Sequence, residues 1–92
     1  MIVRIATERQ YRLPDETADR LNELDNEAVA AVEADDEPRF RQLFDEMLTI
    51  VRRDGQLVEE DELTGSQIII PPPDLTFAEA KGEFTGEGLI PD

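Results

Sequence analysis

The chain has 92 residues, of which 23 are acidic and 9 are basic, so its formal net charge at pH 7 is −14. It contains no cysteine and no histidine. This excludes disulfides, thiolate or imidazole metal ligands, and any Ser-His-Asp or Cys-His catalytic group within this chain. Nucleic acid and anionic lipid are not expected as partners, because both require a basic protein surface.

The length predicts a single domain over residues 1–92. No stretch approaches the roughly 20 apolar residues that span a bilayer, so direct membrane insertion is not expected. Arg4 interrupts the apolar start of the chain and Glu8 follows it, which is unlike a signal peptide. We therefore expect a soluble, cytoplasmic protein.

The first 13 residues predict a β-hairpin. Residues 2–6 are rich in β-branched side chains and residues 10–13 alternate in polarity, and both patterns are typical of strands. Residues 7–9 would form the turn between them. Tyr11 is expected at a half-buried position of the second strand.

Two amphipathic helices are predicted next. Pro14 and Asp15 suit the first turn of a helix, and residues 35–38 break this helix and cap the following one. Apolar side chains recur at helical spacing in both segments. In the first they are Leu21, Leu24, Ala28, Ala31 and Val32, and in the second Phe40, Leu43, Phe44, Met47, Leu48 and Val51. Gly55 would end the second helix in the left-handed conformation, and the short break predicts an antiparallel helical hairpin.

The last third of the chain predicts a strand, a stiff connector and a short helix. Residues 68–70 are three isoleucines, typical of a strand with both faces buried, whereas residues 57–58 are a weaker candidate for a strand. Pro71–Pro73 have fixed φ angles and no backbone N–H, which favours an extended connector. Residues 76–79 match a capping box that starts a helix reaching about Phe84.

Together these elements predict an α+β fold. A small sheet, made of the N-terminal hairpin and the strand near 68–70, would pack against the antiparallel helical hairpin, with the short C-terminal helix beside them.

Two acidic segments are the candidates for a metal site. Residues 59–62 lack the alternating ligands and central glycine of a calcium loop, so a solvated loop explains them better. Residues 35–37 are better explained as a helix boundary. Residues 86–88, Gly-Glu-Gly, are too short for a phosphate loop. No metal and no cofactor is therefore expected.

Four apolar residues are candidates for binding a partner: Leu89, Ile90, Phe40 and Phe44. Leu89 and Ile90 could pack on the protein's own sheet or dock on a partner, with the glycines before them allowing a turn. Phe40 and Phe44 belong to the core first, although part of their helix could form a groove for a partner helix.

Several segments resemble the PspA-associated protein family, PspAA. The resemblance runs along nearly the whole chain, through Met1–Ile5, Gln10–Pro14 and Leu21–Asn26. It is most specific at residues 70–76, Ile-Pro-Pro-Pro-Asp-Leu-Thr, and at residues 84–91, Phe-Thr-Gly-Glu-Gly-Leu-Ile-Pro. The family often has glycine where this chain has Arg9, which leaves the form of the first turn open.

The resemblance implies an accessory or regulatory partner of PspA, a coiled-coil protein that lines stressed membranes in the envelope-stress response. It supplies no catalytic residues, so we do not expect an enzyme. The expected partner is a PspA-like coiled coil, which could bring the protein to the inner face of the membrane, and homo-oligomerisation is also open. The alternative is a self-associating acidic structural domain that regulates another protein.

The charged residues also suggest a source. Eight of the nine basic residues are arginine and Lys81 is the exception. Abundant Asp and Glu with almost no Lys is typical of a halophilic cytoplasm. A bacterium with a GC-rich genome is the alternative, since such genomes also favour arginine.

We predict that stability rises with salt. The 14 excess negative charges repel one another over a small surface, and the Debye length falls to about 3 Å in molar salt, which screens this repulsion. Thermal melts in low salt and in molar KCl measure the effect. A melting temperature that stays constant or falls as KCl is added would contradict the halophilic interpretation.

Overall fold

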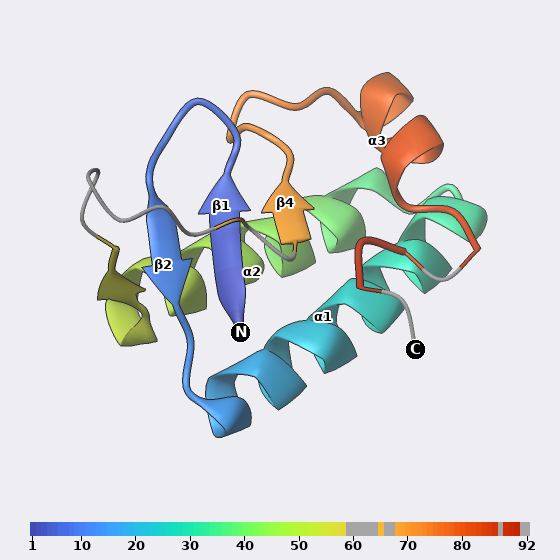
Figure 1. Ribbon diagram of the computed structural model, residues 1–92. Helices are drawn as coiled ribbons and strands as arrows, with labels where there is room; N and C mark the ends of the chain where they lie inside the picture. The colour runs from blue at the N-terminus through green and yellow to red at the C-terminus, as the bar shows by residue number, and fades with distance from the viewer. Residues whose placement is uncertain (59–64, 66–67, 87, 91–92) are drawn as a thin grey trace.

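The computed structural model describes residues 1–58, 65, 68–86 and 88–90. The acidic run at 59–62 lies outside these residues. The elements follow in the order β1 (Ile2–Ile5), β2 (Gln10–Arg12), α1 (Asp15–Glu33), α2 (Glu37–Asp54), β3 (Gln56–Leu57), β4 (Ile68–Ile70) and α3 (Phe77–Glu83). A small sheet, the two long helices α1 and α2 packed together, and the short helix α3 make up the fold. Figure 1 shows their arrangement, which confirms the expected α+β class.

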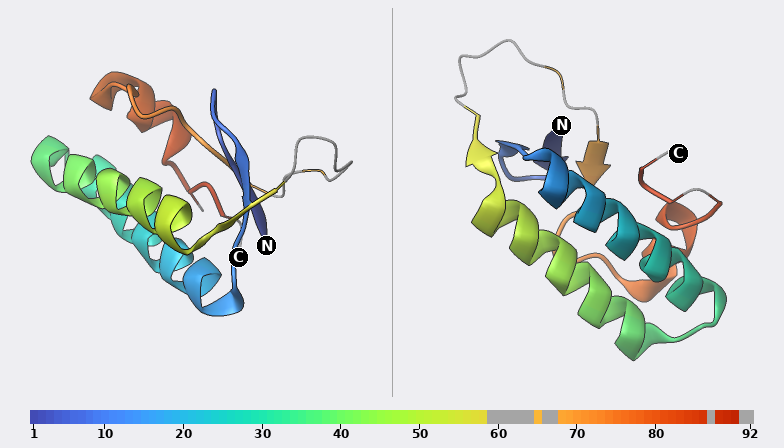
Figure 2. Two further views of the ribbon diagram at one scale, coloured as in Figure 1. Left: turned by 90° about the vertical axis from the view of Figure 1, so that its left-hand side faces the viewer. Right: turned by 90° about the horizontal axis from the view of Figure 1, so that it is seen from below.

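The sheet has four strands in the order β3-β2-β1-β4. β1 and β2 form the predicted antiparallel hairpin, in which Val3 lies opposite Tyr11. β4 pairs with β1 in parallel, and Val3 lies opposite Ile68. The weak strand candidate at 57–58 is found one residue earlier, as β3, and pairs with the outer edge of β2. Figure 2 shows the two long helices side by side on one face of the sheet.

The prediction that β4 is buried on both faces is wrong. Ile68 and Ile70 are buried, but Ile69 is 60% exposed. Successive side chains of a strand point to opposite faces, and helices α1 and α2 cover one face of this sheet. Ile69 therefore points to the other face, as its neighbour Arg4 on β1 does.

The helical hairpin agrees with its sequence pattern. Every apolar position predicted for the two long helices is buried. Between them, Asp35 has a positive φ of 58°, and the Asp36 carboxylate accepts a hydrogen bond from the Arg39 N–H at 3.2 Å. Residues 35–37 thus form a capped helix boundary, as expected.

Gly55 does not have the left-handed conformation predicted for it. Its φ of −78° and ψ of 146° are extended. The residue is required for close approach instead: a Cβ at this position would collide with the Val51 carbonyl oxygen and would lie 2.9 Å from the Tyr11 Cβ. The missing side chain lets α2 end directly against β2.

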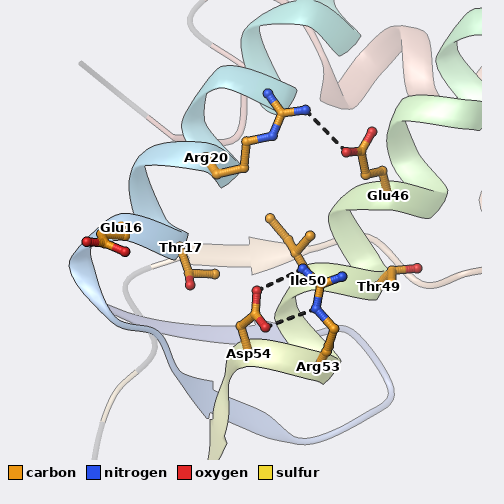
Figure 3. Close-up of a pocket in the computed structure, with 8 residues that line it drawn as sticks. All are labelled: Glu16, Thr17, Arg20, Glu46, Thr49, Ile50, Arg53 and Asp54. Carbon is orange, nitrogen blue, oxygen red and sulfur yellow. Dashed lines mark hydrogen bonds and ion pairs between the residues drawn. The ribbon is translucent and has the colours of Figure 1, made fainter.

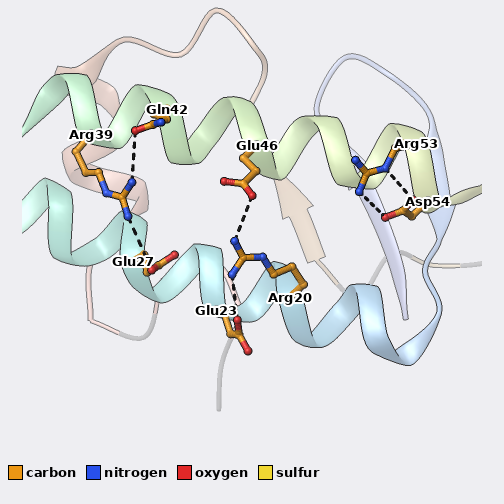
Figure 4. A network of polar contacts seen from close by, with 8 residues as sticks. All are labelled: Arg20, Glu23, Glu27, Arg39, Gln42, Glu46, Arg53 and Asp54. Carbon is orange, nitrogen blue, oxygen red and sulfur yellow. Dashed lines mark hydrogen bonds and ion pairs between the residues drawn. The ribbon is translucent and has the colours of Figure 1, made fainter.

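Ion pairs lie along the exposed side of the helical hairpin (Figure 4). Arg20 of α1 bonds Glu46 of α2 at 3.2 Å, and Arg39 of α2 lies 3.9 Å from Glu27 of α1. Exposed pairs of this kind contribute little to stability, because water screens them and two long side chains lose conformational freedom. We infer that they influence how the two helices align more than they stabilise the fold.

We predict that Leu43→Asp unfolds the protein. Leu43 is 2% exposed on the buried face of α2, and burying an unpaired carboxylate there costs several kcal/mol against a total stability of roughly 5–15 kcal/mol. Gln42→Asp, at the exposed neighbouring position, adds the same charge without burying it and should melt close to the native protein. A folded Leu43→Asp variant would mean that this stripe is not core.

Candidate functional site

Phe40 and Phe44, two of the predicted partner-binding residues, are fully buried. Their rings stack with centroids 5.6 Å apart. Phe84, which follows α3, meets both rings edge-on at 5.1 and 6.1 Å, and Phe77 contacts Phe40 at 5.8 Å. This aromatic cluster attaches α3 to α2, and a partner-binding role for Phe40 and Phe44 stays a prediction.

Leu89 and Ile90, the other two predicted residues, pack against the protein's own core. Ile90 is 6% exposed and Leu89 is partly buried. The chain reaches this position through Gly86 and Gly88, whose φ angles are +59° and +78°. The Gly88 N–H also bonds the Thr85 carbonyl at 2.9 Å. The turn expected at these glycines is present, and the tail packs against the core of this same chain.

Asp25 of α1 holds the tail in place. Its side chain is fully buried. Oδ1 accepts a hydrogen bond from the Leu89 N–H at 3.0 Å, and Oδ2 accepts one from the Ile90 N–H at 2.8 Å. A carboxylate taken out of water is costly unless it is hydrogen-bonded, and bonds between an ionised acceptor and backbone N–H groups are among the stronger ones. The tail therefore supplies donors that allow this carboxylate to be buried.

Gly88 completes the arrangement. A Cβ at residue 88 would lie 2.7 Å from both Asp25 oxygens, which is closer than real Cβ atoms approach other groups. Glycine is thus required twice at this position, by its positive φ and by the carboxylate packed against it. We call Asp25, Gly88, Leu89 and Ile90 the Asp25 latch.

Asp25 is not among the site residues predicted from the sequence, although its position in the chain carries a signal. Asp25 lies four residues after Leu21 and three before Ala28, so it occupies a position on the apolar stripe of α1. A carboxylate on such a stripe implies a buried partner. The pattern did not indicate which segment supplies that partner, because the partner lies 64 residues away.

Apart from the Asp25 latch, a shallow pocket lies between the two long helices, on the exposed side of the hairpin (Figure 3). Its volume is about 330 Å³, and its lining is mostly charged. Hydrogen bonds to Glu23 and Glu46 raise the pKa of Arg20, and the bond to Arg53 lowers the pKa of Asp54. These charges largely neutralise one another. Across the described residues, no three Asp or Glu side chains gather closely enough to hold a metal ion.

A family model described as PspA-Associated protein matches residues 1–92. The chain belongs to the PspAA family. No curated protein and no solved structure matches it. Within the described part of this PspAA chain, no helix has both the length and the apolar character needed to cross a membrane.

The structure gives physical roles to the two segments that most resemble PspAA. Residues 70–76 carry the chain from β4 to the capped start of α3. The described residues of 84–91 include Phe84 of the aromatic cluster and the tail part of the Asp25 latch. Both segments attach to the helical hairpin, one through the Leu75 carbonyl, which accepts from Arg41 at 2.7 Å, and the other through Asp25.

We predict that Gly88→Ala destabilises this PspAA chain more than Gly86→Ala does. Both positions have positive φ, which costs a non-glycine residue about 1–2 kcal/mol, but residue 86 has open space around it whereas residue 88 faces Asp25. The difference between the two melting temperatures therefore measures the contact with the carboxylate. Equal losses would contradict the latch.

Asp25→Ala tests the latch from the other side. It leaves the Leu89 and Ile90 N–H groups without their carboxylate acceptor, and an unsatisfied buried donor costs about 1–3 kcal/mol. We expect a large fall in melting temperature and faster hydrogen exchange at both amides. Deleting residues 89–92 should give a similar loss of stability, and unchanged stability would mean that the tail does not support the fold.

Proposed function

We propose that this protein is a non-enzymatic accessory component of the PspA envelope-stress response, which binds PspA or a complex that contains it. The observation that carries the proposal is the family match over residues 1–92, because the description of the family links it to PspA. The composition agrees, since the chain offers neither histidine nor cysteine for catalysis.

The exposed face of the helical hairpin is a suitable surface for such a partner. α1 carries exposed acidic side chains at Asp19 and Glu33, and α2 carries one at Asp45. Glu23, Glu27 and Glu46 lie on the same two helices but are ion-paired with Arg20 and Arg39. A coiled coil that presents basic positions would complement this face. Charges of this kind contribute more to the on-rate and to orientation than to affinity. PspA would then bring the protein to the inner face of the membrane, on the cytoplasmic side.

Self-association is the second candidate function. β3 and β4 are the two edges of the sheet, and edge strands can pair with another chain. Leu57 on β3 is 45% exposed and Ile69 on β4 is 60% exposed. Sedimentation of the purified protein separates the alternatives, because a self-associating domain forms oligomers without PspA.

Co-purification from stressed cells, at the salt concentration of the source, tests the proposal. We expect PspA to be captured by the tagged native protein and not by the unfolded Leu43→Asp variant, which carries the same tag. With purified proteins, the on-rate should fall as KCl is raised, because screening weakens long-range attraction. Absence of PspA from the captured material, together with no binding between the purified proteins, would overturn the proposal.

A further inference from the structure

A groove lies between the end of β4, the proline connector and α3. Ala6, Ile69, Pro71, Pro72 and Leu75 form its apolar lining. Its volume is about 420 Å³, within the range of roughly 300–1,000 Å³ that is usual for binding pockets. Figure 1 shows the connector (orange) running from β4 across one end of the sheet to α3. We call this site the β4–α3 groove.

The floor of the groove is unusually apolar for this surface. Among the described residues, Ile69 and Leu57 are the large hydrophobic side chains that stay exposed, and they lie on opposite edges of the sheet. A single exposed isoleucine needs no explanation. Ile69, however, adjoins prolines 71 and 72 and Leu75 in one continuous lining.

The rim of the groove is acidic. Glu79 and Glu83 line it from α3, four residues apart and therefore one turn apart on the same face of the helix. The backbone N–H and the hydroxyl of Thr76 both donate to Glu79, and these bonds lower the pKa of Glu79. Its carboxylate thus stays ionised at neutral pH. None of the described residues that line the groove is basic, and the nearest basic neighbour on the sheet is Arg4, which lies opposite Ile69 on β1 and on the same face.

Hydrogen bonds and an ion pair fix the segments that line the groove. The Leu75 N–H bonds the Pro72 carbonyl at 3.0 Å, and Arg41 of α2 donates to the Leu75 carbonyl at 2.7 Å. Lys81 of α3 bonds Asp35 at 2.8 Å. With fixed proline φ angles as well, floor and rim are positioned before anything binds, which reduces the entropy lost on binding.

We propose that the β4–α3 groove binds an amphipathic helix of a partner protein, seating an aliphatic side chain against Ile69 with flanking lysine or arginine side chains facing Glu79 and Glu83. This inference rests on the proposed function, because it takes PspA as the partner protein. In such a partner helix, the aliphatic side chain would match the apolar floor of the groove. Basic side chains one turn apart would match the spacing of Glu79 and Glu83.

Two other occupants fit less well. An added strand would pair with β4 over three residues and then meet Pro71–Pro73, which have no N–H to continue the ladder. A second copy of this chain would bring another net charge of −14 to an acidic rim. Charge complementarity therefore favours a basic helix from a different protein.

Binding of purified PspA to variants of the full chain tests the inference. Ile69→Lys removes the apolar floor and adds a positive charge, and it should weaken binding at least tenfold. Leu57→Lys makes the same exchange at the opposite edge of the sheet and should leave the dissociation constant within twofold. Both positions are exposed, so both variants should keep a near-native melting temperature. Equal affinities for PspA would overturn the groove while leaving the proposed function intact.

The charge of the rim has its own test. The double variant Glu79→Gln, Glu83→Gln removes two negative charges, and glutamine at residue 79 can still accept the capping hydrogen bonds. It should weaken PspA binding and reduce the dependence of binding on salt. An unchanged salt dependence would mean that the two carboxylates do not face the partner's basic residues.

A probe that does not depend on PspA separates the two proposals. A synthetic amphipathic peptide of leucine and lysine is titrated into the 15N-labelled protein, with a leucine and glutamate peptide as control. We expect amide shifts at Ile69, at Leu75 and along α3 with the basic peptide alone, and their loss in Ile69→Lys. Shifts confined to α1 and α2, no shifts, or dimerisation through Ile69 would overturn the groove. Shifts in the groove without PspA binding would keep the groove and overturn the proposed partner.

Discussion

The fold depends on a carboxylate that has been taken out of water. Asp25 lies on the inner side of α1, fully buried, and its two oxygens bind the Leu89 and Ile90 N–H groups. Neither side of this contact is stable alone, because a buried carboxylate needs donors and buried backbone N–H groups need acceptors. The tail and the first helix therefore hold each other in place, in a chain too short to rely on a large core.

The same contact sets where the other elements lie. Residues 89 and 90 are bonded to α1, and this fixes the segment that follows Phe84. The Phe84 ring packs against Phe40 and Phe44 and so completes the aromatic cluster between α2 and α3. With α3 fixed at its far end and the connector fixed by Arg41, Glu79 and Glu83 are held beside the apolar floor of the β4–α3 groove. A buried interaction thus shapes an exposed surface on another part of the molecule.

Periodic features could be predicted from the sequence, and long-range features could not. The helices, their boundary at Asp36 and the capping box at Thr76 follow from spacing and local hydrogen bonding, and the hairpin follows from polarity alternation. The prediction that Ile69 is buried is wrong because three consecutive isoleucines show no alternation, so nothing in the sequence marks the exposed face of β4. The left-handed conformation predicted for Gly55 is wrong because the need for glycine comes partly from the close approach of Tyr11, which is distant in sequence and so is not shown by any local pattern. The Asp25 latch joins residues 64 and 65 positions apart, beyond any periodic pattern.

The latch also determines when the chain can finish folding during its synthesis. Asp25 leaves the ribosome 65 residues before Ile90, which at about 5–20 residues per second is a delay of roughly 3–13 s. Throughout this interval α1 carries a charged group on its apolar side with no backbone donors from the tail to receive it. The helical hairpin can therefore collapse early, yet its inner surface reaches its final packing after the last turn of the chain arrives. Folding of this protein is therefore completed only after residue 90 has been synthesised and its N–H can reach Asp25.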